Sequence, residues 1–209
     1  AKDVGMASQD VIQAISDTIQ TGGYGMEEAT KIAEQTMMLA NVAEMTQEAA
    51  SEGVVTMLSA FKLDPLKEIP VVVDGVTKST NELTNAMDKI NYVGNNFAIS
   101  SDGILTAITS GANVLAEYGV SMDDTVAMIA SANTTLQDSS RVGNGLKTIA
   151  INLAGIKANA SNGTLELNKT AKALKEIAGI DVFENEETGE LKNMPQLIDE
   201  IASKWSSFT

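Results

Sequence analysis

Apolar side chains recur every three or four residues along most of this chain, which is the spacing of one face of an α-helix. Each periodic stretch is short, roughly 10 to 18 residues, and Gly, Asn, Ser or Pro interrupts it. A heptad pattern sustained over three or more repeats is missing, which excludes a long coiled coil. The pattern predicts a mainly α protein: a compact multi-helix array of about eight to nine short helices with a small C-terminal β-hairpin.

The apolar stripes place the expected helices along the chain. They run through residues 11–19, 26–40, 50–61, 83–93, 104–115, 122–129, 142–156, 174–177 and 197–205. Thr46 and Ser121 are expected to cap two of these helices, because a hydroxyl before the first turn accepts an otherwise unpaired N–H. Pro195 suits the first turn of the last helix. The helix through residues 83–93 is expected to fray at residues 94–96.

The stripe through residues 142–156 is the most regular of the series. It consists of Val142, Leu146, Ile149, Leu153 and Ile156, spaced by four and three residues in alternation. This spacing predicts a helix with all five side chains pointing inward.

Three segments depart from the helical pattern. Residues 71–73 are three valines followed by Asp74-Gly75, and they fit either a short strand or one turn of helix, of which the helical turn is favoured here. Residues 159–163 are expected to form a loop, and residues 181–191 a β-hairpin that turns near Gly189. The expected domains are a helical core over residues 1–158 and a helix–hairpin–helix appendage over residues 159–209.

The charge and composition exclude several classes of function. The formal net charge is −14 and the only arginine is Arg141, which disfavours binding to nucleic-acid phosphates or anionic lipid. The same charge suits a passage through which DNA slides without sticking, although ordinary solubility is the favoured explanation of the charge. The chain has no Cys and no His, so it lacks the usual ligands of zinc, haem and iron–sulfur clusters and the bases of common catalytic triads.

Two segments resemble ligand-binding loops only superficially. Residues 143–148, Gly-Asn-Gly-Leu-Lys-Thr, lack the glycine that a phosphate loop requires before Lys-Thr. They are interpreted as close helix packing at Gly143 and Gly145, with Lys147 solvated. Residues 181–192 are acidic, but Phe183 and Lys192 stand where calcium needs oxygen ligands. We therefore expect no cofactor, no metal and no enzymatic activity.

No apolar run approaches the ~20 residues of a membrane span, and no signal peptide is visible. The chain starts at Ala1 rather than at a methionine, which suggests a segment of a longer protein.

The stretch of residues 83–157 resembles the core region of phage tail tape measure proteins. The likeness rests on ordered features: an Asn-rich corner, a Gly-x-Ser connector that opens the next helix, and a Gly-x-x-Leu-Lys-Thr helix. The residues that carry these features are Asn95, Gly119, Ser121, Asp123, Asp124, Gly143, Gly145, Leu146, Lys147 and Thr148. Looser similarity extends over residues 26–63 and 174–191, whereas residues 65–77 look like an insertion.

This resemblance implies a virion tail component that is made in the bacterial host cytoplasm. It implies a part in tail length determination, tail tube assembly and DNA ejection. The implied partners are the tail tube, a tail assembly chaperone, baseplate or tip proteins and further copies of the chain, without specific nucleic-acid binding. Because the helices are short and broken, a folded module fits better than a piece of a long rod. The alternative is a helical effector or adhesin-type binding module of a secreted bacterial protein.

Overall fold

The computed structural model describes residues 8–153, 156–158, 165–185 and 187–207. Over these residues the protein is mainly α, with nine α-helices, one 3-10 helix and three two-stranded antiparallel sheets. The helices are α1 Ser8–Gly22, α2 Met26–Val42, α3 Gln47–Phe61, α4 Glu82–Asn96, α5 Ser101–Glu117, α6 Met122–Leu136, α7 Ser139–Leu153, α8 Lys169–Ala178 and α9 Met194–Ser203. The strands are β1 Glu68–Val73, β2 Val76–Asn81, β3 Ile156–Ala158, β4 Leu165–Leu167, β5 Phe183–Asn185 and β6 Glu190–Leu191, and the 3-10 helix is Trp205–Ser207.

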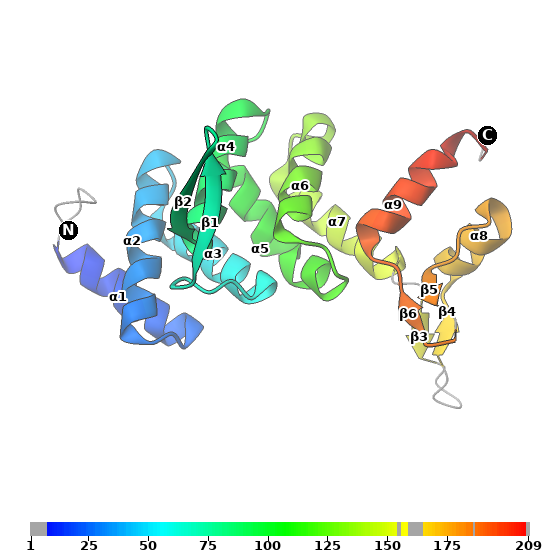
Figure 1. Ribbon diagram of the computed structural model, residues 1–209, viewed down its shortest axis with the longest axis horizontal. Helices are drawn as coiled ribbons and strands as arrows, with labels where there is room; N and C mark the ends of the chain where they lie inside the picture. Colours follow the sequence, from blue (N-terminus) through cyan, green and yellow to red (C-terminus); the bar gives the residue numbers. More distant parts are fainter. Residues whose placement is uncertain (1–7, 154–155, 159–164, 186, 208–209) are drawn as a thin grey trace.

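The helices follow one another along the long axis of the molecule (Figure 1). Helices α1 and α2 lie at one end and α8 and α9 at the other. Helix α5 is central, since it packs extensively against both α3 and α7 and also contacts α4 and α6. Each helix therefore buries its apolar face mainly against its neighbours in the array, and the mainly α prediction is confirmed.

Glycines set how closely the central helices approach. A Cβ atom built on Gly53 of α3 would lie 2.8 Å from the Cβ of Leu105 on α5. On the α7 side of α5, a Cβ on Gly111 would lie 2.6 Å from the carbonyl oxygen of Gly143. Both distances are well below ordinary van der Waals contact, so α5 and α7 cross backbone against backbone, and the backbone of α3 lies directly on the Leu105 side chain of α5. The absence of a side chain is what permits this spacing.

Side chains cap the start of most of the described helices, and the predicted caps Thr46 and Ser121 are among them. The Thr46 hydroxyl accepts the N–H of Ala49 at the start of α3 (3.2 Å), and the Asn193 amide accepts that of Gln196 at the start of α9 (3.0 Å). Pro195 lies in the first turn of α9, as predicted. Because these caps satisfy N–H groups that have no partner inside the helix, they define the boundaries of the short helices.

The favoured helical turn at residues 71–73 is wrong. These valines belong to β1, which pairs with β2 through a two-residue turn at Asp74 and Gly75. Both turn residues have positive φ, 53° and 77°, as a type I′ hairpin requires. The β-branched valines and the Asp-Gly turn favour a hairpin here. Three consecutive β-branched residues would lose side-chain freedom in a helical turn.

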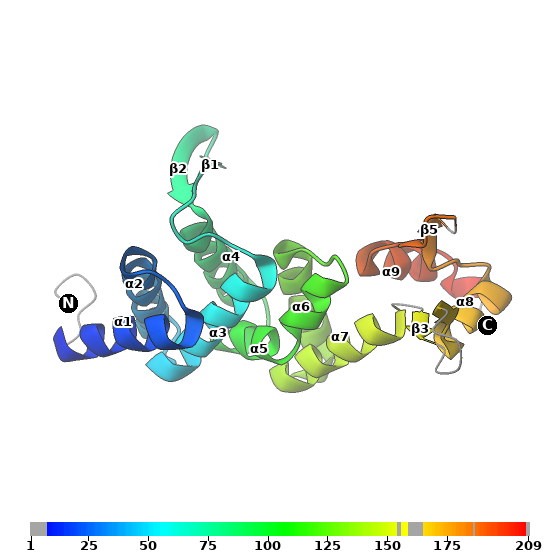
Figure 2. The ribbon, with the colours of Figure 1, turned by 90° about the horizontal axis from the view of Figure 1, so that it is seen from below.

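The base of this hairpin is tied to the start of α4. The N–H of Glu82 donates to the carbonyl oxygen of Lys67 (3.1 Å), while the Glu82 carboxylate accepts the N–H of Asp64 (2.9 Å) and pairs with Lys67 (2.6 Å). Beyond this base the hairpin projects away from the helices (Figure 2). The segment that looked like an insertion is thus an ordered arm.

Several apolar side chains expected inside lie at the surface. Ile149 is 44% exposed, because α7 contacts the backbone of α5 at Gly143 and its buried face is centred on Gly143, Leu146 and Ala150. Ile156 lies beyond the end of α7, in β3. Further exposed members of the expected stripes are Ile12, Met26, Ile177 and Trp205.

The C-terminal elements agree with the predicted hairpin and add a second pair of strands. Strands β5 and β6 pair antiparallel, and Gly189 has the positive φ (73°) expected at the turn. Strands β3 and β4 form another short pair that the sequence did not indicate. The loop predicted for residues 159–163 lies outside the described residues. The predicted fraying of residues 94–96 is wrong, since α4 continues to Asn96.

Candidate interaction surface

The Gly-x-Ser connector is a junction between two helices. Gly119, with φ of 74°, ends α5, and its N–H donates to the carbonyl oxygen of Ala116 (3.0 Å). The Ser121 hydroxyl accepts the N–H of Asp124 (3.1 Å) and donates to its carboxylate (2.7 Å) at the start of α6. These residues therefore form a turn and a helix cap.

Removing the cap of α6 tests this assignment. Ser121→Ala is expected to lower the free energy of unfolding by about 1 kcal/mol, because the N–H of Asp124 loses its acceptor. Ser131→Ala, at an exposed position inside the same helix, is the matched control and should leave stability unchanged or slightly higher. Urea unfolding followed by far-UV circular dichroism measures both variants. Equal losses would contradict a specific capping role for Ser121.

The residues of the Gly-x-x-Leu-Lys-Thr pattern lie on different faces of α7. Gly143 and Leu146 face the core, and the Thr148 hydroxyl donates to the carbonyl oxygen of Asn144 (2.8 Å). A Cβ on Gly145 would have no neighbour within 4 Å, so close packing at Gly145 is a wrong prediction, whereas at Gly143 it is confirmed. Lys147 is half-buried on α7, so the structure does not place it as fully solvated. These positions do not converge on a binding site.

The Asn-rich corner also has a local role. The Asn95 amide donates to the side-chain oxygen of Asn91 (3.1 Å), and the Asn96 amide donates to the carbonyl oxygen of Tyr92 (2.7 Å). Both bonds reach back one turn along α4 and support its last turn. Asn133 of α6 donates to the carbonyl oxygen of Ala98 in the following connection (2.9 Å), which positions that connection against α6.

An open groove lies between β1, α4 and α6, and it is the surface best suited to a partner. Its volume is about 1040 Å³. The apolar side chains that line it include Val72, Val73, Tyr92, Phe97, Val126 and Ala130. Tyr92 is 63% exposed and Phe97 56%. Exposed aromatic side chains gathered with valines are typical of protein-binding surfaces, because they have much apolar area to bury on contact.

Charged side chains of α4 and α6 lie among the lining of this groove. Lys89 of α4 places its Nζ 2.7 Å from both carboxylate oxygens of Asp123 on α6. Asp88 also lines the groove, and burial raises the pKa of its carboxyl group. Asp88 is nevertheless an exposed residue. The groove therefore combines an apolar lining with the Lys89–Asp123 ion pair and the Asp88 carboxylate.

Sequence reasoning missed this groove. Asp123 belongs to the tape-measure-like pattern, but the sequence did not mark Tyr92, Phe97 or Val72 as contact residues. The available signal was that Tyr92 and Phe97, two of only eight aromatic residues (four Phe, three Tyr and one Trp), fall outside every apolar stripe. An aromatic side chain off the buried face of its helix is a candidate contact residue.

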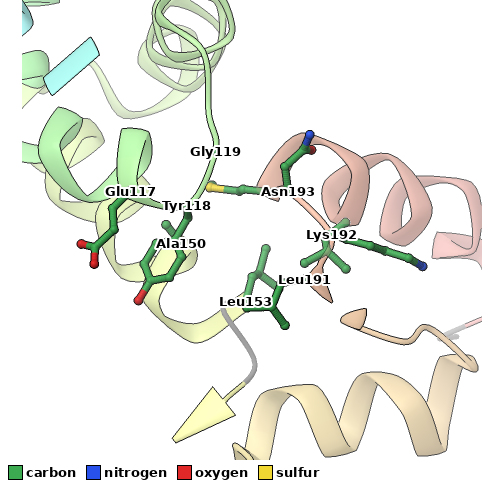
Figure 3. A pocket seen from close by; sticks show the side chains of 10 residues that line it. Glu117, Tyr118, Gly119, Ala150, Leu153, Leu191, Lys192 and Asn193 are labelled. Atoms are coloured by element: carbon green, nitrogen blue, oxygen red, sulfur yellow. The ribbon is translucent and has the colours of Figure 1, made fainter. Parts of the chain in front are cut away.

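A smaller cavity of about 250 Å³ lies where the ends of α5 and α7 meet β6 and α9 (Figure 3). Its apolar wall includes Tyr118, Leu153, Leu191 and Met194. Its lysine, Lys192, pairs with Glu200 of α9 at 2.6 Å. The cavity lies at the contact between the central helices and the C-terminal elements. Glu117 is the one carboxylate among its lining residues, so the cavity lacks a carboxylate pair for acid–base chemistry.

The family described as phage-related minor tail protein matches this chain over residues 1–209. The chain belongs to this family. No solved structure matches it. Membership supports a structural role in the phage tail, among the other components of tail assembly.

The remaining side-chain chemistry of this minor tail protein is sparse. Within the described ranges, no cluster of three or more carboxylate groups is placed to hold a metal ion. The adjacent carboxylates of Asp123 and Asp124 turn to different partners, Lys89 and Ser121. For the same part of the chain, no helix is both long enough and apolar enough to cross a membrane.

Proposed function

We propose that this chain is a folded, non-enzymatic module of a tape measure protein, located in the virion tail. In this role it contributes to tail length determination, tail tube assembly and DNA ejection. The observation that carries the proposal is family membership over the whole chain, together with the ordered tape-measure-like features between residues 83 and 157. The assignment to phage tails does not depend on the assignment to a tape measure protein.

The geometry of the helices supports a module rather than a stretch of ruler. A straight α-helix adds about 1.5 Å per residue, so the 17-residue helix α5 spans only about 26 Å. Helices α3 and α7 cross α5 at glycines, which folds the chain back on itself. A ruler of this chain length would need one extended helix, and the apolar faces buried here would then be exposed to water.

The proposed partners are other proteins of the tail. The tail tube, a tail assembly chaperone and the baseplate or tip proteins are the candidates that the tape-measure assignment brings. The groove beside Tyr92 and Phe97 supplies an apolar surface for such a contact. The net charge of −14 keeps the module from adhering to DNA that passes it during ejection.

Deletion of the module in the phage tests the proposal. Removal of residues 8–207 in frame is expected to give shorter tails, or no tubes at all, in electron micrographs of lysates. About 200 residues of continuous helix would account for about 300 Å of tail, so a much smaller shortening indicates a folded contribution. A Gly145→Ala phage, altered at a position where an added Cβ meets nothing within 4 Å, is the control and should keep normal tails.

Two outcomes of this deletion would count against the proposal. Tails of normal length with normal infectivity would show that the module is dispensable. Tails of normal length that no longer adsorb to cells would instead favour the adhesin-type alternative. Adsorption assays on the same particles separate these two cases.

A further inference from the structure

The β1–β2 hairpin is a two-stranded ribbon that stands away from the helical array (Figure 2). Residues 76–79 of β2 are all exposed, and Val72 of β1 is 71% exposed. An isolated two-stranded hairpin is only marginally stable in water, and it has two edges with unpaired backbone groups. A further strand would therefore stabilise this arm, and the unpaired backbone groups at its edges are available to bind one.

The register shows which backbone groups point outward. In a two-residue hairpin, the residues that flank the turn, Val73 and Val76, exchange both hydrogen bonds, and the bonded pairs then alternate along the ladder. Val71 with Lys78 and Ile69 with Thr80 are bonded in turn. The bond from the N–H of Glu82 to the carbonyl oxygen of Lys67 continues this alternation.

The two edges of the hairpin are not equivalent. The outward-facing pairs are Val72 with Thr77, Pro70 with Ser79, and Glu68 with Asn81. On the β1 edge, Pro70 has no N–H and interrupts the row of donors, which is a common way to block the addition of a strand. On the β2 edge, Thr77 and Ser79 keep both N–H and C=O groups facing outward. Only the β2 edge is therefore suited to pairing.

The charge of the hairpin favours a second copy of this chain as the occupant. Residues 67–81 contain two lysines and two acidic residues, so the arm is neutral in a chain of net charge −14. Six-residue strands span about 20 Å, which is more than the ~8 Å screening length at physiological salt. Two copies that meet through their arms keep their acidic bodies apart, whereas contact between the bodies would be repulsive.

We propose that β2 pairs antiparallel with β2 of a second copy, with Ser79 on the two-fold axis, to form a four-stranded sheet. This inference does not depend on the tape-measure assignment. In this register Thr77 lies opposite Asn81 of the second copy and Lys78 lies opposite Thr80. If the two-fold axis passed through Lys78 instead, Lys78 would lie opposite Lys78 of the second copy. Repulsion between the two like charges disfavours that register. The Ser79 register also pairs residues 77–81 throughout.

Matched proline variants test the edge. Thr77→Pro removes an outward N–H from the β2 edge, and Val72→Pro removes its cross-strand counterpart from the β1 edge. Neither change breaks a bond within the hairpin. Sedimentation velocity over a concentration series is expected to show dimers for the native chain and for Val72→Pro. Thr77→Pro should raise the dimer Kd at least about tenfold. A native chain that stays monomeric, or equal weakening by both prolines, would overturn the proposal.

Single cysteines test the register, because the native chain has none. Directly opposed residues in an antiparallel bonded pair have Cα atoms about 5.5 Å apart, within the range that a disulfide needs. Ser79→Cys should therefore form covalent dimers under mild oxidation. In this register residue 78 lies opposite Thr80 of the second copy, two residues from the other residue 78. Lys78→Cys should therefore cross-link much more slowly. Comparable cross-linking of the two variants, or none with Ser79→Cys, would refute the pairing.

Discussion

Replacement of Gly143 by alanine is expected to lower the free energy of unfolding by about 1–3 kcal/mol, as overpacking of a tight contact does. A Cβ at this position would overlap the carbonyl oxygen of Ala107 and lie 2.8 Å from the Cβ of Ser110, both on α5. The first of these is a backbone atom that cannot rotate away. Helices α5 and α7 would therefore have to separate, and the buried side chains around the crossing would lose contacts.

The neighbouring glycine of the same helix provides the control. Gly145→Ala adds a Cβ that meets nothing within 4 Å, so it should raise the free energy of unfolding by about 0.5–1 kcal/mol through helix propensity. The two variants have identical chemistry and differ only in their surroundings. Urea denaturation gives both values. A gain in stability for both would mean that α5 and α7 do not make the close crossing.

Ile108→Ala is the second change with a large expected effect. Ile108 lies in the middle of α5 with none of its surface exposed, and it belongs to the main hydrophobic core. Its truncation removes apolar contacts and leaves a cavity, so we expect a loss of about 2–5 kcal/mol. Because a single domain of this kind is stabilised by only about 5–15 kcal/mol, this loss should produce a lower thermal midpoint and partial unfolding at moderate temperature.

Ile149→Ala is the matched control for this change. Ile149 lies in α7, which packs against α5, and the same substitution gives the same gain in helix propensity. Its side chain is 44% exposed, so the loss should stay within about 0.5 kcal/mol of zero. Thermal and urea unfolding of the two variants measure the difference. Similar losses would show that α7 is rotated toward the orientation that the sequence stripe indicates.

The candidate groove and the hairpin edge give the protein two surfaces of different character. The groove contributes exposed aromatic and apolar side chains beside Asp88, whereas the edge of β2 contributes backbone donors and acceptors. The first suits a partner with an apolar anchor, and the second suits an extended strand. Both are built by the residue 65–77 segment and its neighbours, which is where the chain departs from the tape-measure-like pattern.

The helical part of the fold was largely predictable from local patterns. Thr46, Ser121 and Pro195 marked helix starts because capping depends on a few neighbouring atoms. The turn at Gly189 was predictable for the same reason. The strand at residues 71–73 was misjudged, although the valines and Asp-Gly turn favoured it locally.

Other features depended on contacts between distant residues. The two glycines Gly143 and Gly145 are alike in sequence, yet only the first faces α5. The rotation of α7 that exposes Ile149 follows from that contact. Tyr92 and Phe97 lie in a groove because the tertiary fold places β1 beside α4 and α6.

By itself, the sequence determined the helical class, the helix starts, the acidic charge and the lack of cysteine and histidine chemistry, because these depend on residue type and on spacing within a few residues. The tertiary structure decided which face of each helix is buried, which glycine is essential, and where the exposed groove and the open strand edge lie. These properties depend on which backbones approach each other, and an apolar stripe several residues wide leaves a helix free to rotate until a close contact such as that at Gly143 selects one orientation.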